Sequence, residues 1–180
     1  MAVGDALARL RAAYASELRL YRAHHACRAN WLLHAACVPL EWAACLLALA
    51  QLAPRAPWLA QLALGAYVLP LHPPISVALG PAQLALAALV DALGAALPST
   101  RARLAVALCA WCGSWLLQVP VGHWLLERNQ PAMVTRLTLN SAILAVPLAW
   151  DWGGGGPRGE PSLRGEPQRA RGCWNFGCWN

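Results

Sequence analysis

The feature that most constrains this chain is a series of apolar segments, most of them long enough to cross a bilayer, between Trp31 and Trp152. Of the 180 residues, 58% are hydrophobic and only 12% are charged, which is too apolar for a soluble domain of this length. In lipid, the backbone polar groups of a spanning segment must bond to one another, and an α-helix does this within a single segment. The sequence therefore predicts an all-α protein, a multi-pass transmembrane helical bundle.

We expect about four to five spans. The candidate segments are residues 31–53, 58–79, 81–97, 104–126 and 137–152. The second contains Pro70, Pro73 and Pro74, which predict either a kinked span or two half-helices that meet inside the membrane. The third segment is short and would cross only with tilt or local thinning of the bilayer.

Two other regions flank these segments. Residues 5–24 place apolar side chains at helical spacing among arginines, which predicts an N-terminal amphipathic helix that lies on the membrane or caps the bundle. Residues 153–180 are rich in Gly, Pro and Arg and cannot bury a core, so we expect a disordered tail. The predicted organisation is one membrane-embedded domain over residues 1–152 followed by that tail.

The net charge of +6 indicates contact with lipid headgroups, because the arginines stand mainly between the apolar segments and at both ends. A nucleic-acid surface would interleave basic residues with stacking aromatics. Here Trp31, Trp42 and Trp58 lie within or at the ends of apolar runs, as interfacial anchors do. Membrane lipid is therefore an expected partner and nucleic acid is not. The seven cysteines are scattered over apolar positions and do not resemble a disulfide framework.

The first group of chemically active candidates is His24, His25, Asn30 and His34. On one unbroken helix His25 and His34 would point to opposite sides, but Asn30 is a good helix cap and predicts a turn that lets them converge. If Asn30 is helical, its amide lies one turn from His34 and can orient the imidazole. The alternative reading places His24 and His25 among the headgroups and lets His34 bond to a neighbouring helix.

The second group lies in the string that runs from Gln118 to Glu127. His123 and Glu127 are four residues apart, so an imidazole and a carboxylate can share a metal, or the carboxylate can fix the ring tautomer. The alternative is that Glu127 pairs with Arg128 or Arg136 at the interface. Taken together, the two groups favour a site for a first-row metal ion such as iron or zinc, because buried imidazoles and a carboxylate satisfy one another best around a cation.

The two groups together resemble a known family, the endoplasmic-reticulum 2-hydroxy fatty acid dioxygenases associated with phytosphingosine breakdown in fungi. The resemblance spans roughly residues 10–152. It rests on Tyr21…His25-x4-Asn30-x3-His34 with Pro39 soon after, and on Gly122-His123-x3-Glu127-x3-Pro131-Ala132.

The resemblance implies an iron(II)-dependent enzyme of the endoplasmic-reticulum membrane that uses O2 to shorten a long-chain 2-hydroxy fatty acid by one carbon. It implies His25, His34 and His123 as the Fe(2+) ligands. The remaining roles that it implies are a fourth ligand or a base at Glu127, an orienting group at Asn30, and substrate-contacting wall residues at Tyr21 and Gln118.

The sequence departs from the family pattern at two places. Gln118 stands five residues before His123, with Pro120 between them, where the pattern has one residue fewer. The glycine that is usual between His34 and Pro39 is not present, since Ala35, Ala36, Cys37 and Val38 fill that stretch. Two other functions compete with the dioxygenase: a non-catalytic membrane scaffold or lipid-binding homologue, and a haem protein that uses paired histidines.

Overall fold

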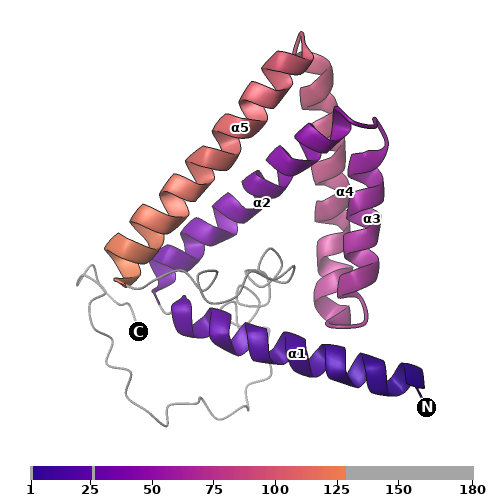
Figure 1. Cartoon of the computed structure of the whole chain (residues 1–180), viewed down its shortest axis with the longest axis vertical. Helices are drawn as coiled ribbons and strands as arrows, with labels where there is room; N and C mark the ends of the chain where they lie inside the picture. Colours follow the sequence, from indigo (N-terminus) through magenta and orange to yellow (C-terminus); the bar gives the residue numbers. More distant parts are fainter. Residues whose placement is uncertain (1, 26, 129–180) are drawn as a thin grey trace. The chain divides into compact units, whose positions relative to one another are not determined.

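The computed structural model describes residues 2–25 and 27–128, and every regular element in these residues is helical (Figure 1). The elements are α1 (Ala2–His24), α2 (Arg28–Ala50), α3 (Ala56–Val68), α4 (Pro73–Ala96), α5 (Thr100–Leu116) and the π-helix η1 (Leu117–Glu127). The all-α prediction is thus confirmed for the described part of the chain. The amphipathic character and membrane contact proposed for the N-terminal helix stay predictions.

Three helical stretches are long and apolar enough to cross a membrane. They are Arg28–Ala50, Pro73–Ala96 and the continuous stretch Thr100–Glu127. The shortest has 23 residues, or about 35 Å of α-helix, against a hydrocarbon core of about 30 Å. At most 28% of the apolar window in each stretch is buried inside the described part of the protein, as expected of helices that present apolar side chains to lipid. These properties are those of a multi-pass membrane protein.

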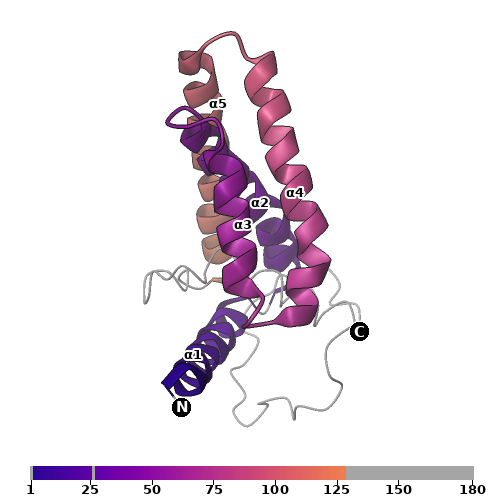
Figure 2. The same cartoon turned by 90° about the vertical axis from the view of Figure 1, so that its right-hand side faces the viewer.

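The prolines of the predicted second span break the helix, and the chain reverses there. Helix α3 ends at Val68, and α4 begins at Pro73 with proline in its first turn, where the missing N–H costs no hydrogen bond. The two helices lie side by side (Figure 2). The boundary predicted between residues 79 and 81 is wrong, because α4 continues through Pro81 to Ala96.

The consequence is that α3, with 13 residues, is too short to cross the hydrocarbon core by itself. The segments expected to span at 58–79 and 81–97 therefore become one short helix and one spanning helix. The predicted last span at 137–152 and the tail at 153–180 lie outside the described residues.

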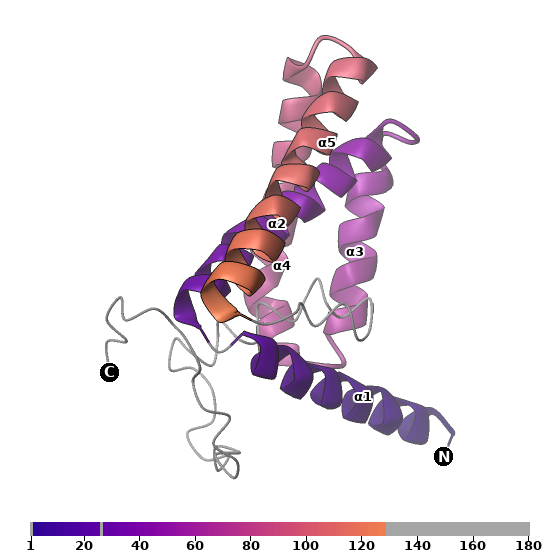
Figure 3. The ribbon, with the colours of Figure 1, turned by 60° about the vertical axis from the view of Figure 1, so that its left-hand side comes forward.

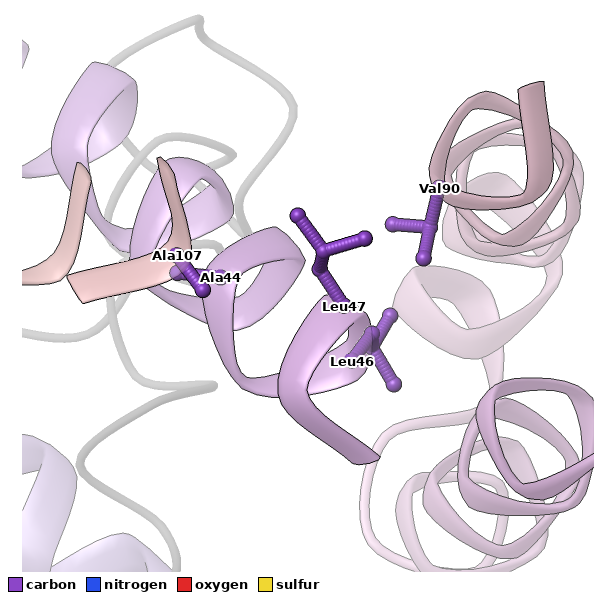
Figure 4. Packing of buried hydrophobic residues seen from close by; sticks show 5 residues of the cluster. All are labelled: Ala44, Leu46, Leu47, Val90 and Ala107. Atoms are coloured by element: carbon purple, nitrogen blue, oxygen red, sulfur yellow. The ribbon is translucent and has the colours of Figure 1, made fainter. Parts of the chain in front are cut away.

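The chain divides into two compact units, whose described residues are 2–16 and 37–114 in the first, and 17–25, 27–36 and 115–128 in the second. The core of the first unit joins α2 to α4 and α5. Figure 4 shows Leu47 pointing toward Val90 of α4, and Ala44 close to Ala107 of α5. Small residues such as these two alanines let helix backbones approach closely, which is the usual means of packing helices in lipid.

Polar side chains of the first unit also bond between elements. The Trp42 indole donates to the Gln61 side chain at 3.0 Å, and Gln61 is almost fully buried. The Arg11 guanidinium donates to the Pro70 carbonyl at 2.8 Å, a carbonyl in the turn between α3 and α4. These bonds satisfy polar groups that would otherwise be exposed to an apolar medium.

Helix α5 continues without a break into η1, which Figure 3 shows as the end of the ribbon coloured orange. In a π-helix each N–H bonds to the carbonyl five residues earlier, and most examples are single-turn bulges. Here the π-helix has 11 residues and contains Pro120. It ends at Glu127, and the C-cap residue Arg128 has a left-handed backbone (φ 53°) and donates its N–H to the His123 carbonyl.

Candidate metal centre

Three histidines converge in the second unit. One possible ligand atom of each of His25, His34 and His123 lies within 4.8 Å of the other two. The three side chains come from the turn after α1, from α2 and from η1, and they are exposed by only 2%, 6% and 2%. We call these residues the histidine triad. The turn predicted between His25 and Asn30 is present, since α1 ends at His24 and α2 begins at Arg28.

The rings of the triad meet edge to face. Their centroids are 4.4 Å apart for His25 and His34, 4.9 Å for His25 and His123, and 5.0 Å for His34 and His123. Rings in such close mutual contact leave no planar gap for a porphyrin between any two of them. The geometry therefore argues against the haem alternative.

Backbone carbonyls set the tautomer of two triad members. His25 Nδ1 lies 2.8 Å from the Tyr21 carbonyl, and His34 Nδ1 lies 3.0 Å from the Asn30 carbonyl. A carbonyl oxygen only accepts, so Nδ1 carries the proton in each ring and the lone pair lies on Nε2. Metal-binding histidines commonly donate their second ring nitrogen to a carbonyl in this way, which fixes the ring and raises its basicity.

This donor set suits a first-row metal ion. Metal–nitrogen bonds of about 2.1 Å place neighbouring ligands roughly 3 to 3.5 Å apart, so the rings need to close only slightly from their present separations. Nitrogen ligands without a thiolate set are typical of iron or zinc. A buried cation also offers neutral imidazoles the electrostatic partner that an apolar interior lacks.

Tyr21 forms one wall of the triad. Its ring stacks on His25 with centroids 3.8 Å apart and an interplanar angle of 18°, and its edge approaches His34 at 6.5 Å between centroids. Tyr21 is itself buried. The residue expected to contact substrate thus lies directly against two triad members.

Asn30 is fully buried beside the triad, but it is not the helix cap that the sequence predicts. It lies inside the first turn of α2, and its main-chain carbonyl, not its amide, bonds to His34. The amide group points instead toward η1. Its Nδ2 lies 3.3 Å from Glu127 Oε1, and a Cβ added at Gly122 would overlap its Oδ1.

Glu127 bonds to the main chain just before α2. Its Oε1 accepts the Cys27 N–H at 2.7 Å, at the start of α2 and 100 residues away in sequence. Among the described residues, the group of mutually close metal-ligand atoms contains the three histidines and does not include Glu127. The roles of fourth ligand and base that were expected for Glu127 stay predictions. Arg136, one of its two alternative ion-pair partners, lies outside the described residues.

The π-helix accommodates the extra residue between Gln118 and His123. On an α-helix, residues five apart are separated by about 140° around the axis. On a helix with bonds between residues five apart they lie one turn apart, on the same face. Gln118 and His123 are both buried, with exposures of 6% and 2%. Sequence reasoning did not predict this π-helix, although the extra residue and Pro120 are the two signals that point to it.

Several other polar residues belong to the first unit. His72 precedes α4 as its N-cap residue, in the first unit. Asp91 accepts a hydrogen bond from the Trp58 indole at 2.7 Å. Cys109 and Cys112 are exposed on α5 and form no disulfide with described residues.

The comparison with protein families agrees with this site. Residues 12–153 match the family described as "2-hydroxy-palmitic acid dioxygenase Mpo1-like". The chain belongs to the Mpo1-like family. No curated protein and no solved structure matches the chain significantly.

Membership of the Mpo1-like family confirms the resemblance seen in the sequence motifs. The matched region includes the whole histidine triad, Tyr21, Asn30, Gln118 and Glu127. The family name implies a dioxygenase of lipid metabolism, and three apolar helices suit residence in a membrane.

Proposed function

We propose that this protein is an Fe(II)-dependent dioxygenase of the endoplasmic-reticulum membrane. It shortens long-chain 2-hydroxy fatty acids by one carbon, a step of fatty acid α-oxidation and of sphingoid-base breakdown. The observation that carries the proposal is the convergence of three buried histidines within a member of the Mpo1-like family.

His25, His34 and His123 are the proposed iron ligands. Bound there, Fe(II) would supply two positions that chelate the hydroxyl and carboxylate of the substrate and a third position for O2. Three protein ligands leave such positions open. The Tyr21 and Asn30 carbonyls hold two of the rings in the tautomer that this role requires.

The other site residues act around that centre. Tyr21 and Gln118 are the proposed walls of the substrate site, because both are buried and Tyr21 stacks on a ligand ring. Asn30 and Glu127 are the proposed supporting residues. A role for Glu127 beside the metal agrees better with its contacts than a fourth-ligand role, because its Oε1 already accepts the Cys27 N–H.

The chemistry balances without a separate reductant. The hydroxyl-bearing carbon of the substrate becomes the carboxyl carbon of the shortened acid, and the original carboxyl carbon leaves as CO2 together with one water molecule. The substrate therefore supplies all the electrons that O2 accepts. An enzyme that spans the membrane is suited to such a substrate, since the alkyl chain can stay in lipid while the polar end enters the site.

The test uses the full chain purified in detergent. Bound iron is measured, and the protein is then supplied with Fe(II), O2 and 2-hydroxypalmitic acid while mass spectrometry follows the acid one carbon shorter. We expect one iron-dependent product, and we expect His34→Ala and His123→Ala each to abolish it. His72→Ala is the matched control, since this histidine is not among the mutually close metal-ligand atoms of the described residues and should leave turnover unchanged.

Three results would contradict the proposal. Absence of both iron binding and shortened product would favour a non-catalytic scaffold or lipid-binding homologue. A Soret band would indicate haem. Full activity in His34→Ala or His123→Ala would remove that residue from the ligand set.

A further inference from the structure

The Asn30 side chain is held between two positions of the π-helix. Its Oδ1 lies where a Cβ at Gly122 would stand, and its Nδ2 donates to Glu127 Oε1. Gly122 and Glu127 are five residues apart, which is one turn of a π-helix, so both positions face α2. We call Gly122 and Glu127 the Asn30 socket.

The socket depends on glycine at position 122. A Cβ there would overlap the Asn30 amide oxygen, would stand 3.2 Å from its Cγ and would lie 3.5 Å from His34 Cε1. The amide cannot move aside cheaply, because Asn30 is fully buried. By contrast, a Cβ added at Gly113, earlier in the same continuous helical stretch, would meet no atom within 4 Å.

Asn30 and its socket are directly connected to two of the triad histidines, His34 and His123. The main-chain carbonyl of Asn30 accepts from His34, and His123 directly follows Gly122 in the chain. The fit of Asn30 against Gly122 therefore sets how closely the backbones that carry His34 and His123 approach each other.

Glu127 extends the same arrangement to the third histidine. Its Oε1 accepts both the Asn30 amide and the Cys27 N–H, and Cys27 lies two residues after His25. One carboxylate oxygen thus joins the end of η1 to the turn that carries His25.

From these contacts we infer that Gly122 and Glu127 are positioning residues, whose socket for Asn30 holds the triad close to metal-binding separation before any metal arrives. The inference rests on the proposed function in that it takes the triad as the metal site. It assigns Glu127 to positioning and not to the set of metal ligands.

The test is a double-mutant cycle read by Co(II) binding to the full chain in detergent. Co(II) is the probe because its visible absorption reports both affinity and coordination geometry. We expect Gly122→Ala to weaken Co(II) binding about 10- to 100-fold and to change the spectrum, as loss of a residue that supports metal ligands does. Gly113→Ala is the control and should bind Co(II) as the wild type does.

The decisive comparison is Gly122→Ala in an Asn30→Ala background, where the side chain that the new Cβ would meet is gone. We expect the glycine substitution to cost less than about twofold there. Equal costs in both backgrounds would overturn the socket, because contacting residues are coupled and independent ones are additive.

Glu127 is tested by two substitutions. Glu127→Gln retains an oxygen that can accept the Cys27 N–H. It should therefore bind Co(II) within a few fold of the wild-type affinity and with the wild-type visible spectrum. Glu127→Ala should lose about tenfold. A metal ligand would behave differently, since the amide would then be nearly as damaging as alanine, and that result would overturn the positioning role.

The same cycle is repeated on metal-free protein by following thermal unfolding. Coupling between positions 30 and 122 is expected there too, because the socket forms without metal. Wild-type protein that binds no Co(II) but shows this coupling would contradict the proposed function and support the socket. Additive changes in the melting temperature of metal-free protein, together with normal Co(II) binding, would refute the socket alone.

Discussion

Deleting Pro120 is expected to leave metal binding nearly intact, although it shortens the helix that carries His123. The deletion reduces the spacing between Gln118 and His123 from five residues to four, and residues four apart on an α-helix are only about 40° from alignment. An α-helical turn can therefore replace the π-helical one between Gln118 and His123 and keep both side chains on the same face, while the π-helical turn from Gly122 to Glu127 is retained. Removing proline from a helix interior also removes a cost of about 3 kcal/mol.

The control is a deletion of Ala110 from the regular α-helix α5. Ala107 is held in the packed core before it, and His123 is held in the triad after it. The part of this stretch before η1 is α-helical and stores no surplus residue, so the deletion moves the Cα of each residue that follows it in α5 by about 3.8 Å, the distance between neighbouring Cα atoms. That movement is comparable with the 4.8 Å that bounds the ligand atoms of the triad.

The assay is Co(II) titration of each purified variant, with circular dichroism to check helix content. We expect deletion of Pro120 to keep affinity within about threefold, or about 0.7 kcal/mol, and deletion of Ala110 to lower it by more than about 100-fold. If deletion of Pro120 is as damaging as deletion of Ala110 while helix content is preserved, the π-helix does not store the extra residue and the reasoning fails.

Three further predictions concern packing and the metal. Leu47→Ala removes a side chain that is 2% exposed and points toward Val90, so it should destabilise the protein by about 2 to 5 kcal/mol, measured by thermal or denaturant unfolding in detergent. The control Leu52→Ala, at a site 84% exposed, should change stability by less than about 0.5 kcal/mol. Trp42→Phe removes the donor to Gln61, and since interhelical hydrogen bonds in membrane proteins average about 0.6 kcal/mol, a loss above 2 kcal/mol would contradict that assignment. Stripping metal with a chelator should lower the melting temperature, and returning Fe(II) at 100 times its dissociation constant should restore about 2.7 kcal/mol, an effect that must be absent in His123→Ala.

The helical class and much of the chemistry were predictable because both depend on local properties of the sequence. Apolar length and the need to satisfy the backbone in lipid predict helices such as α2 without knowledge of their neighbours. The position of Asn30 after His25 predicted a turn, and the structure has one just before α2. The convergence of His25, His34 and His123 was expected from the family resemblance, and the structure brings these three residues together. The assignment of iron and of separate residue roles stays a prediction.

The prolines show that helix boundaries could not be predicted from residue type alone. Pro73 and Pro74 begin α4, while Pro81 lies inside it. The same residue type starts a helix at one place and is tolerated at the other, and the sequence alone predicted a boundary at the wrong one. Local sequence does not decide between them, because a proline in a first turn loses no hydrogen bond and a proline inside a helix in lipid can also be tolerated.

By itself, the sequence determined that this chain forms helices long and apolar enough to cross a membrane, with a few histidines among their apolar residues, since hydropathy and residue spacing act over short distances. Only the tertiary structure decided that the stretch around Pro120 is a π-helix, that Glu127 and not Asn30 bonds to the start of α2, and that Asn30 lies against Gly122. The physical reason is that an α-turn and a π-turn differ by one residue, and which of them forms depends on the partner that the helix meets. That partner is about 100 residues away in the chain.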